Sequence, residues 1–194
     1  MKNVIKKSIL LVTVFTTMLS IANEIPNSIK NTYKETALTI NNVSQGDLLT
    51  IKDYNGIVLY KELIKFSGTY KKGFDLTALP SGDYFFEVDK DMEINTIPFT
   101  VSSNSVVFNK EEETSIFKPY LRQKGDLVLI SKLAPNLEPL NVSIYSELNG
   151  SSELVYTQKV EGLQAIDLAY RLKKGNFKIV FNSNGKEFTK FINN

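Results

Sequence analysis

The sequence predicts an all-β protein built from antiparallel β-sandwiches, and two observations lead to this prediction. Apolar residues alternate with polar ones over short runs, a pattern that places one apolar row on one face of a strand. Turn-forming residues separate the runs at intervals of about 8–12 residues, a spacing typical of sandwiches and barrels. The expected core rows are Leu38 and Ile40; Leu49 and Ile51; Tyr84, Phe86 and Val88; Ile97, Phe99 and Val101; Leu127 and Leu129; Val142 and Ile144; and Phe177, Ile179 and Phe181.

Glycine-containing turns connect the expected strands. The pairs Asn55-Gly56, Asn149-Gly150 and Asn184-Gly185 predict two-residue hairpin turns, because both central positions of such a turn need a positive φ angle. After the first of these turns, Ile57 and Leu59 are expected to return an apolar row to the core.

Three groups of residues occur twice, in one order and at nearly one spacing, with offsets of 96, 92 and 93 residues. Asn55-Gly56 with Leu59-Tyr60 returns as Asn149-Gly150 with Val155-Tyr156, Phe74-Asp75-Leu76 returns as Ile166-Asp167-Leu168, and the segment 79–84 returns as the segment 172–177. We therefore expect two tandem sandwich modules, residues 23–103 and residues 104–194.

Residues 1–22 have the pattern of a secretory signal peptide. It consists of a positive region with Lys2, Lys6 and Lys7, an uncharged and mostly apolar run at 8–18, and small residues at Ser20 and Ala22, after which we place the cleavage. The apolar run is shorter than the ~20 residues that span a bilayer, and no later stretch reaches that length. The expected product is secreted or periplasmic, without a membrane span, and no cysteine is present to carry a lipid anchor.

Composition excludes several classes of chemistry. The 194 residues contain no His, Cys or Trp, so a Ser-His-Asp triad, a thiol nucleophile, a disulfide and a thiolate zinc site are all excluded. Removing residues 1–22 lowers the number of basic residues from 23 to 20, against 21 acidic ones, and this balance argues against a nucleic-acid partner. We expect no enzymatic activity and no cofactor.

The first of the repeated segments resembles a known family. From Leu49-Thr50-Ile51-Lys52-Asp53-Tyr54-Asn55-Gly56 through Phe74-Asp75-Leu76 to Leu79-Pro80-Ser81-Gly82-Asp83-Tyr84, residues 48–101 resemble the C-terminal sorting domains of type IX secretion cargo in Bacteroidota. The second copy follows this pattern more loosely, and the whole chain resembles small secreted flavobacterial proteins of unassigned activity. The resemblance implies an immunoglobulin-like sandwich and raises the possibility of a sorting role.

Candidate site residues are few, and the sequence assigns no catalytic, cofactor-binding or metal-binding residue. The segment Asp89-Lys90-Asp91-Met92-Glu93 offers three carboxylates to Ca²⁺, but it lacks the Gly and the distal Glu of an EF-hand loop and better suits a solvated hairpin. Glu111-Glu112-Glu113 suits a charged loop between modules, and Asp75 and Asp167 suit outward positions. An outward Phe85 is a possible contact for a glycan, a partner or the second module.

The sequence thus predicts an exported, non-enzymatic binding or structural module at the cell envelope or outside the cell. One alternative is a sorting or recognition element linked to type IX secretion, and another is a glycan- or calcium-binding accessory protein. Pro98 is expected to mark an edge strand, because proline cannot donate to a strand ladder. Two small modules without a disulfide are expected to pack together. The partner, an unknown protein or envelope component, and the oligomeric state stay open.

Overall fold

The computed structural model describes residues 36–103 and 105–194, so the predicted signal peptide, residues 1–22, lies outside the described residues. Of the described residues, 68% are in strands and 4% in short helices, which confirms the all-β prediction. Every strand pairing is antiparallel. The strands form two sets of facing sheets, and each set encloses one apolar core.

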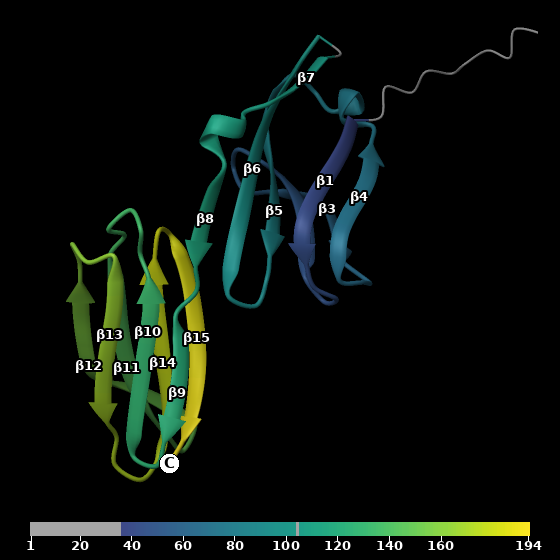
Figure 1. The fold of residues 1–194 in the computed structure, drawn as a ribbon. Coiled ribbons are helices and arrows are strands. Elements are labelled where there is room, and N and C mark those ends of the chain that lie inside the picture. Colours follow the sequence, from purple (N-terminus) through teal and green to yellow (C-terminus); the bar gives the residue numbers. More distant parts are fainter. Residues whose placement is uncertain (1–35, 104) are drawn as a thin grey trace, which may run out of the picture. The chain divides into compact units, whose positions relative to one another are not determined.

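The first set has a pair of strands facing a larger sheet (Figure 1). The pair is β1-β4, and the larger sheet has the order β3-β2-β5-β6-β7, with β8 also on β6. The strands are β1 (Thr36–Val43), β2 (Leu48–Asp53), β3 (Val58–Leu63), β4 (Gly68–Phe74), β5 (Gly82–Asp89), β6 (Glu93–Ser102), β7 (Ser105–Phe108) and β8 (Thr114–Phe117), with 3-10 helices η1 (Leu76–Ala78) and η2 (Lys110–Glu112). We call this set the N-terminal sandwich.

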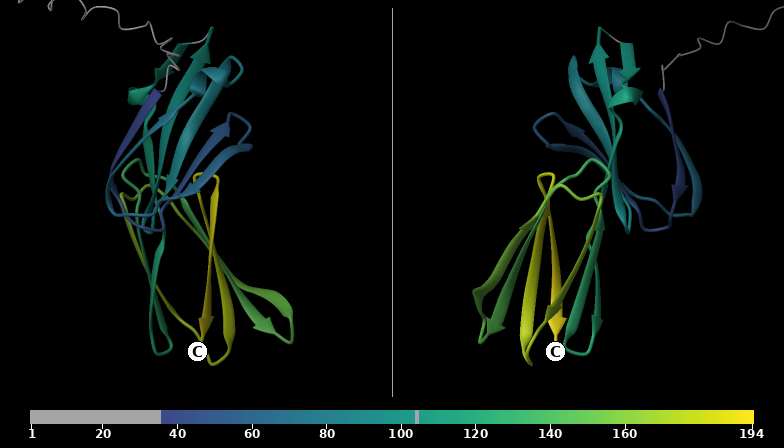
Figure 2. Two further views of the ribbon diagram at one scale, coloured as in Figure 1. Left: turned by 90° about the vertical axis from the view of Figure 1, so that its right-hand side faces the viewer. Right: turned by 60° about the vertical axis from the view of Figure 1, so that its left-hand side comes forward.

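The second set places a three-stranded sheet against a four-stranded one (Figure 2). The sheet orders are β13-β10-β9 and β12-β11-β14-β15. The strands are β9 (Tyr120–Lys124), β10 (Leu127–Leu133), β11 (Leu140–Leu148), β12 (Ser151–Val160), β13 (Ala165–Arg171), β14 (Asn176–Ser183) and β15 (Lys186–Asn193). This set is the C-terminal sandwich.

Both sandwiches use the same crossover. In the first, β1 pairs with β4 while the intervening hairpin β2-β3 belongs to the opposite sheet, and in the second, β10 and β13 flank the hairpin β11-β12 in the same way. The following hairpins, β5-β6 and β14-β15, extend the sheet to which β2 and β11 belong. The three-plus-four arrangement of the C-terminal sandwich, with its Greek-key crossover, is the arrangement of immunoglobulin-like sandwiches.

The cores consist largely of the predicted rows. Phe86 and Phe99 are completely buried in the N-terminal sandwich, where their rings lie 5.1 Å apart. Ile179 and Phe181 are equally buried in the C-terminal sandwich. Two predicted rows were wrong, and each has a physical reason.

The row Leu127 and Leu129 faces outward, since Val128 and Ile130 fill the core instead. Strand β10 is apolar on both faces, so alternation alone does not set its orientation. The predicted orientation kept Lys132 out of the core, whereas the structure buries this lysine.

Ile57 and Leu59 are also exposed rather than buried. The register of β3 on β2 shifts between the pairs Ile51–Tyr60 and Lys52–Val58, so Leu59 is an extra residue. Such a β-bulge switches the alternation of side chains along a strand. Tyr60 therefore packs against the core in place of Leu59.

Two of the three predicted two-residue turns are confirmed. Asn149 and Gly150 have φ angles of 52° and 80°, and Asn184 and Gly185 have 47° and 69°, as such a turn requires. The turn at Asn55-Gly56 is different, because only Gly56 has a positive φ, 81°. The Gly56 amide donates to the Asp53 carbonyl at 2.9 Å. The turn is therefore a longer hairpin loop, with glycine in the left-handed position.

The motif from Leu79 to Tyr84 forms a tyrosine corner. The Tyr84 hydroxyl on β5 donates to the Pro80 carbonyl at 2.9 Å, tying the start of this strand to the loop before it. In the C-terminal sandwich, Phe177 takes the tyrosine's place on β14, and Gly175 before it has a φ of 147°. A Cβ atom at Gly82 or Gly175 would touch the ring two residues on, at 3.7 Å in each case.

The structure corrects one of the repeat offsets. Tyr60 and Phe74 form a T-shaped ring pair with centroids 5.4 Å apart, and Tyr156 and Tyr170 form the matching pair at 5.5 Å. Tyr156 thus follows Tyr60 by 96 residues, and Tyr170 follows Phe74 by the same number. The predicted match of Phe74-Asp75-Leu76 to 166–168, with an offset of 92, is wrong because the first segment ends β4 and the second lies inside β13.

Residues 105–117 pair with the N-terminal sandwich. Strands β7 and β8 occupy successive parts of one side of β6, so β6 is not the bare edge strand that Pro98 predicted. Pro98 lies between the two parts, where its carbonyl accepts from the Asn109 amide at 3.0 Å. The ladder is interrupted at the position where a proline has no N–H to give. The module boundary at 103/104 stays a prediction.

Candidate functional site

The densest polar cluster lies between β3 and β4, where the two sheets of the N-terminal sandwich meet. The Lys72 Nζ donates to the Glu62 carboxylate at 2.5 Å and to the Tyr60 hydroxyl at 2.6 Å. Tyr60 and Tyr70 both donate their hydroxyl protons to the same Glu62 oxygen. The ammonium also lies over the Tyr60 ring, 5.1 Å from its centroid.

The charges in this cluster oppose a catalytic role. The hydrogen bond from Lys72 and that from Tyr60 hold the pKa of Glu62 below its usual range, and the hydrogen bonds of Lys72 to Glu62 and Tyr60 raise the pKa of Lys72. Burial and the nearby Glu62 charge raise the pKa of Tyr70 to about 12. A general base or nucleophile at neutral pH needs a pKa near 7, and each of these shifts leads away from it. The cluster therefore joins the two sheets of the N-terminal sandwich.

The C-terminal sandwich has an uncharged counterpart of the cluster. Gln158 stands where Glu62 does, and its side-chain oxygen accepts from the hydroxyls of Tyr170 at 2.7 Å and Tyr156 at 3.2 Å. Burial and the neighbouring Tyr156 raise the pKa of Tyr170 to about 12. Since the same position works with a neutral amide, the geometry serves packing between the sheets.

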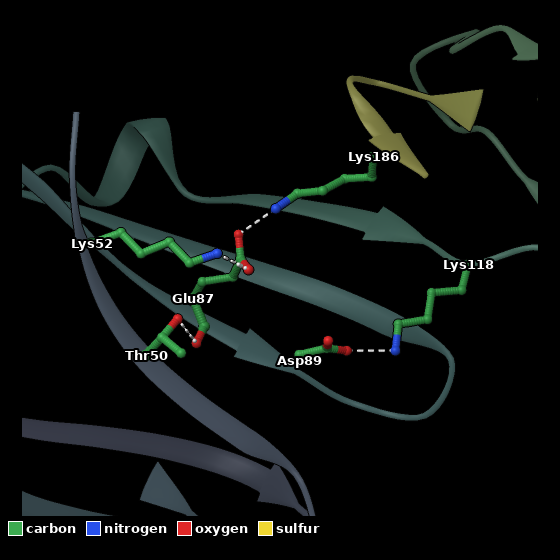
Figure 3. A network of polar contacts seen from close by, with 6 residues as sticks. All are labelled: Thr50, Lys52, Glu87, Asp89, Lys118 and Lys186. Atoms are coloured by element: carbon green, nitrogen blue, oxygen red, sulfur yellow. Dashed lines mark hydrogen bonds and ion pairs between the residues drawn. The ribbon is translucent and has the colours of Figure 1, made fainter. Parts of the chain in front are cut away.

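A second polar network surrounds Glu87 on the outward face of β5 (Figure 3). Lys52 on β2 donates to one carboxylate oxygen at 2.6 Å, and Lys186 at the start of β15 donates to the other at 2.5 Å. Burial by itself raises the pKa of Glu87, but the hydrogen bonds from Lys186 and Lys52 outweigh it and hold the pKa below its usual range. Asp89, on the same strand, pairs with Lys118 at 2.5 Å.

The predicted candidates mostly occupy structural positions. The segment 89–93 is the hairpin between β5 and β6, and Asp89 and Glu93 bind lysines. Across residues 36–103 and 105–194, three or more acidic side chains nowhere gather in a way that could hold a metal ion. Glu111, Glu112 and Glu113 are exposed at η2.

Asp75, Asp167 and Phe85 face away from the cores. Asp167 is exposed on β13, as predicted, and Asp75 accepts from the Thr77 hydroxyl at 2.8 Å. Phe85 lies on the outward face of β5 as predicted, half-buried between Lys52 and Pro98 on the neighbouring strands.

Sequence reasoning missed two buried charged residues in the C-terminal sandwich, Lys132 and Glu138. Lys132 is only 3% exposed, and its Nζ donates to the Leu133 carbonyl at 3.0 Å. Glu138 is 7% exposed and accepts from the Asn136 amide at 3.1 Å. Burial lowers the pKa of Lys132, and the Glu138 charge acts in the opposite direction. Mixed apolar and polar residues on both faces of β10 left no signal in the sequence that could have revealed this burial.

The strongest surface feature is the edge strand β12. It pairs with β11 on one side only, and it carries three exposed apolar side chains in a row, Leu154, Val155 and Tyr156. Val155 is the extra residue of a bulge that corresponds to the one at Leu59 on β3. Unpaired strand edges with apolar side chains are templates for pairing with another chain.

Comparisons with known proteins leave the family open. No protein-family model matches the chain, and no curated protein sequence matches it. A solved chain described as "Biofilm associated protein - BSP domain" is similar, with a TM-score of 0.27 and 10% sequence identity. The similarity covers 83% of this chain and 27% of that chain, so this chain spans about a quarter of the solved one. Within the described residues, no helix is long and apolar enough to cross a membrane.

Proposed function

We propose that this chain is an exported, non-enzymatic binding module that holds an extended segment of a partner protein along strand β12. The observation that carries the proposal is this long edge strand, whose outer backbone groups have no ladder partner among the described strands. An added strand obtains its affinity from main-chain hydrogen bonds and its specificity from alternate side chains. Leu154, Val155 and Tyr156 supply the apolar side chains for such a contact.

Apart from the bulge at Val155, the edge lacks the features that usually protect edge strands. Strand β12 contains no proline, and its single lysine, Lys159, is engaged by Glu161 at 2.5 Å. Edge strands that must stay unpaired are short, or carry proline or several charges. With ten residues, β12 is as long as any strand of the described residues. These properties suit a strand that accepts a partner.

The test is photo-cross-linking in the native cell, with a photoreactive residue placed at Leu154 and, as a matched control, at the exposed loop residue Leu137. We expect one partner protein to be cross-linked from position 154, through a single extended segment. Replacing Val155 with lysine should markedly reduce the yield of this cross-linked product. Equal adducts from positions 154 and 137, or an intracellular location in fractionation, would overturn the proposal.

The sorting alternative remains a hypothesis of its own. The residues that carry the resemblance have folding roles: Gly56 makes a turn, and Tyr84 with Pro80 makes the tyrosine corner. A secreted reporter fused upstream of residues 48–101 tests the alternative, because a sorting element must carry the reporter to the cell surface.

A further inference from the structure

We infer that the outer face of the sheet β13-β10-β9 holds a binding site for a neutral saccharide. This site is distinct from strand addition, because it lies on the outer face of the sheet β13-β10-β9, whereas β12 is an edge strand of the other sheet of this sandwich. A hollow of about 400 Å³ opens on this face. That volume falls within the range of small-molecule sites, roughly 300–1,000 Å³.

Small side chains create the hollow. Strand pairing sets two rows of residues across the sheet, and each row runs from β9 through β10 to β13. The rows are Tyr120–Ser131–Asp167 and Arg122–Leu129–Ala169. Ser131 and Ala169 are short and leave a depression, while Leu129 gives it an apolar floor. The outward orientation of Leu129, which contradicted the core row predicted for it, is what places this floor on the surface.

The groups around the floor match the chemistry of a sugar ring. Tyr120 presents a half-exposed aromatic ring, which can stack on the C–H face of a pyranose. The Asp167 carboxylate can accept hydrogen bonds from two hydroxyl groups, and the Arg122 guanidinium can donate several in a plane. None of these side chains, nor Ser131, has a hydrogen-bond or ion-pair partner within the part of the chain that is described, so their polar atoms face solvent.

The arrangement of charge indicates a neutral ligand. Arg122 and Asp167 lie on the two strands that flank β10, and since neighbouring strands are about 4.8 Å apart, their backbones are separated by roughly 10 Å. One positive and one negative group across the floor leave the hollow without net charge. A ligand that fits this hollow needs an apolar face to lie on the floor. It also needs hydroxyl groups at its edge, because these can both donate to the carboxylate and accept from the guanidinium. Pyranosides have both.

The test uses the whole mature chain and a panel of methyl glycosides and neutral disaccharides, with glucuronate and glucosamine as charged comparisons. Chemical-shift mapping by NMR is expected to show at least one neutral sugar perturbing the amides of Ser131, Leu129 and Ala169. Replacing Asp167 with Asn, or Tyr120 with Ala, should weaken that sugar's binding at least tenfold. Tyr54→Ala, at an exposed tyrosine of the other sandwich, should leave it unchanged.

Three outcomes would overturn the inference. One is that no neutral sugar of the panel shifts these amides at high millimolar concentration. Another is that Asp167→Asn and Tyr120→Ala bind as the unmodified chain does, with their own spectra showing an intact fold. The third is that only the charged sugars bind. None of these outcomes depends on cross-linking at β12, so failure of the saccharide site and failure of the strand-addition proposal are distinguishable.

Discussion

Replacing Tyr84 with phenylalanine isolates the contribution of the tyrosine corner. The substitution removes one hydroxyl group and keeps the ring, which is stacked on Phe99 with centroids 5.6 Å apart. The only described hydrogen bond of that hydroxyl is the one to the Pro80 carbonyl, at 2.9 Å. The change therefore tests whether this bond fastens the loop before β5 to the N-terminal sandwich.

The expected cost follows from the setting of the bond. A typical hydrogen bond within a protein contributes a net 0.5–1.5 kcal/mol, and leaving a buried partner unsatisfied costs about 1–3 kcal/mol. Pro80 is exposed, so its carbonyl can bind water once the hydroxyl is gone. We therefore expect a loss of about 1 kcal/mol in the free energy of unfolding. For a unit of 60–100 residues, that lowers the Tm by roughly 4–8 °C.

Urea unfolding followed by circular dichroism measures the effect, with an unchanged m value as the sign that the folded and unfolded states keep their compactness. Tyr54→Phe is the matched control, because Tyr54 is 84% exposed and makes no hydrogen bond to another described residue. A loss of stability in Tyr84→Phe no greater than in this control would refute the role given to the corner.

Three further substitutions test the electrostatics and the backbone. Glu87→Gln should lower the free energy of unfolding at pH 7, because the folded-state pKa of Glu87 is depressed. The stability that the Glu87 carboxylate contributes is present above the unfolded pKa of about 4.3 and is lost as the pH falls through the folded-state pKa. Denaturation curves of the two proteins should therefore converge in acid. Lys132→Met should stabilise the C-terminal sandwich at pH 7, because burial disfavours the charged form of this lysine. Since the folded-state pKa of Lys132 is lowered, the unmodified protein should gain stability as the pH rises toward the unfolded lysine pKa of about 10.4. Loss of this pH dependence in the variant would show that it arises from Lys132. Gly175→Ala should lower the free energy of unfolding by about 1–3 kcal/mol, because a φ of 147° is strained for a residue with a side chain. Gly82→Ala should lower it less, because the φ of Gly82 lies outside the strained region. Thermal melts that rank these two variants in the opposite order would contradict the strain argument.

The sequence predicted the all-β class and most core rows, because alternation is a direct consequence of strand geometry. In β5 the row Tyr84, Phe86 and Val88 is entirely apolar and buried, whereas the other parity is acidic except for Phe85. The errors arose where local pattern and tertiary context conflict. Strand β10 has apolar residues on both faces. In β3 the bulge at Leu59 inverts the alternation, and no proline or glycine within the strand marks its position.

The candidate surfaces were harder to predict than the core. Tyr120, Arg122 and Asp167 are separated along the chain, and only the register of β9 and β13 on β10 brings them to one face. The apolar edge at Leu154 and Val155 reads in the sequence as an ordinary strand. Its exposure depends on which strand lies next to it, which is a property of the whole sheet.

The crossover described above also constrains how the chain folds. Hairpins closed by Asn-Gly turns, such as β11-β12, need only neighbouring residues and form in about 1–10 μs. The pairing of β10 with β13 must close a loop that contains that entire hairpin, and closing a long loop costs entropy before any contact repays it. We expect this closure to limit the folding rate. Until it occurs, the apolar faces of the hairpins β11-β12 and β14-β15 are exposed together, and a newly synthesised chain would be most prone to aggregate during that interval.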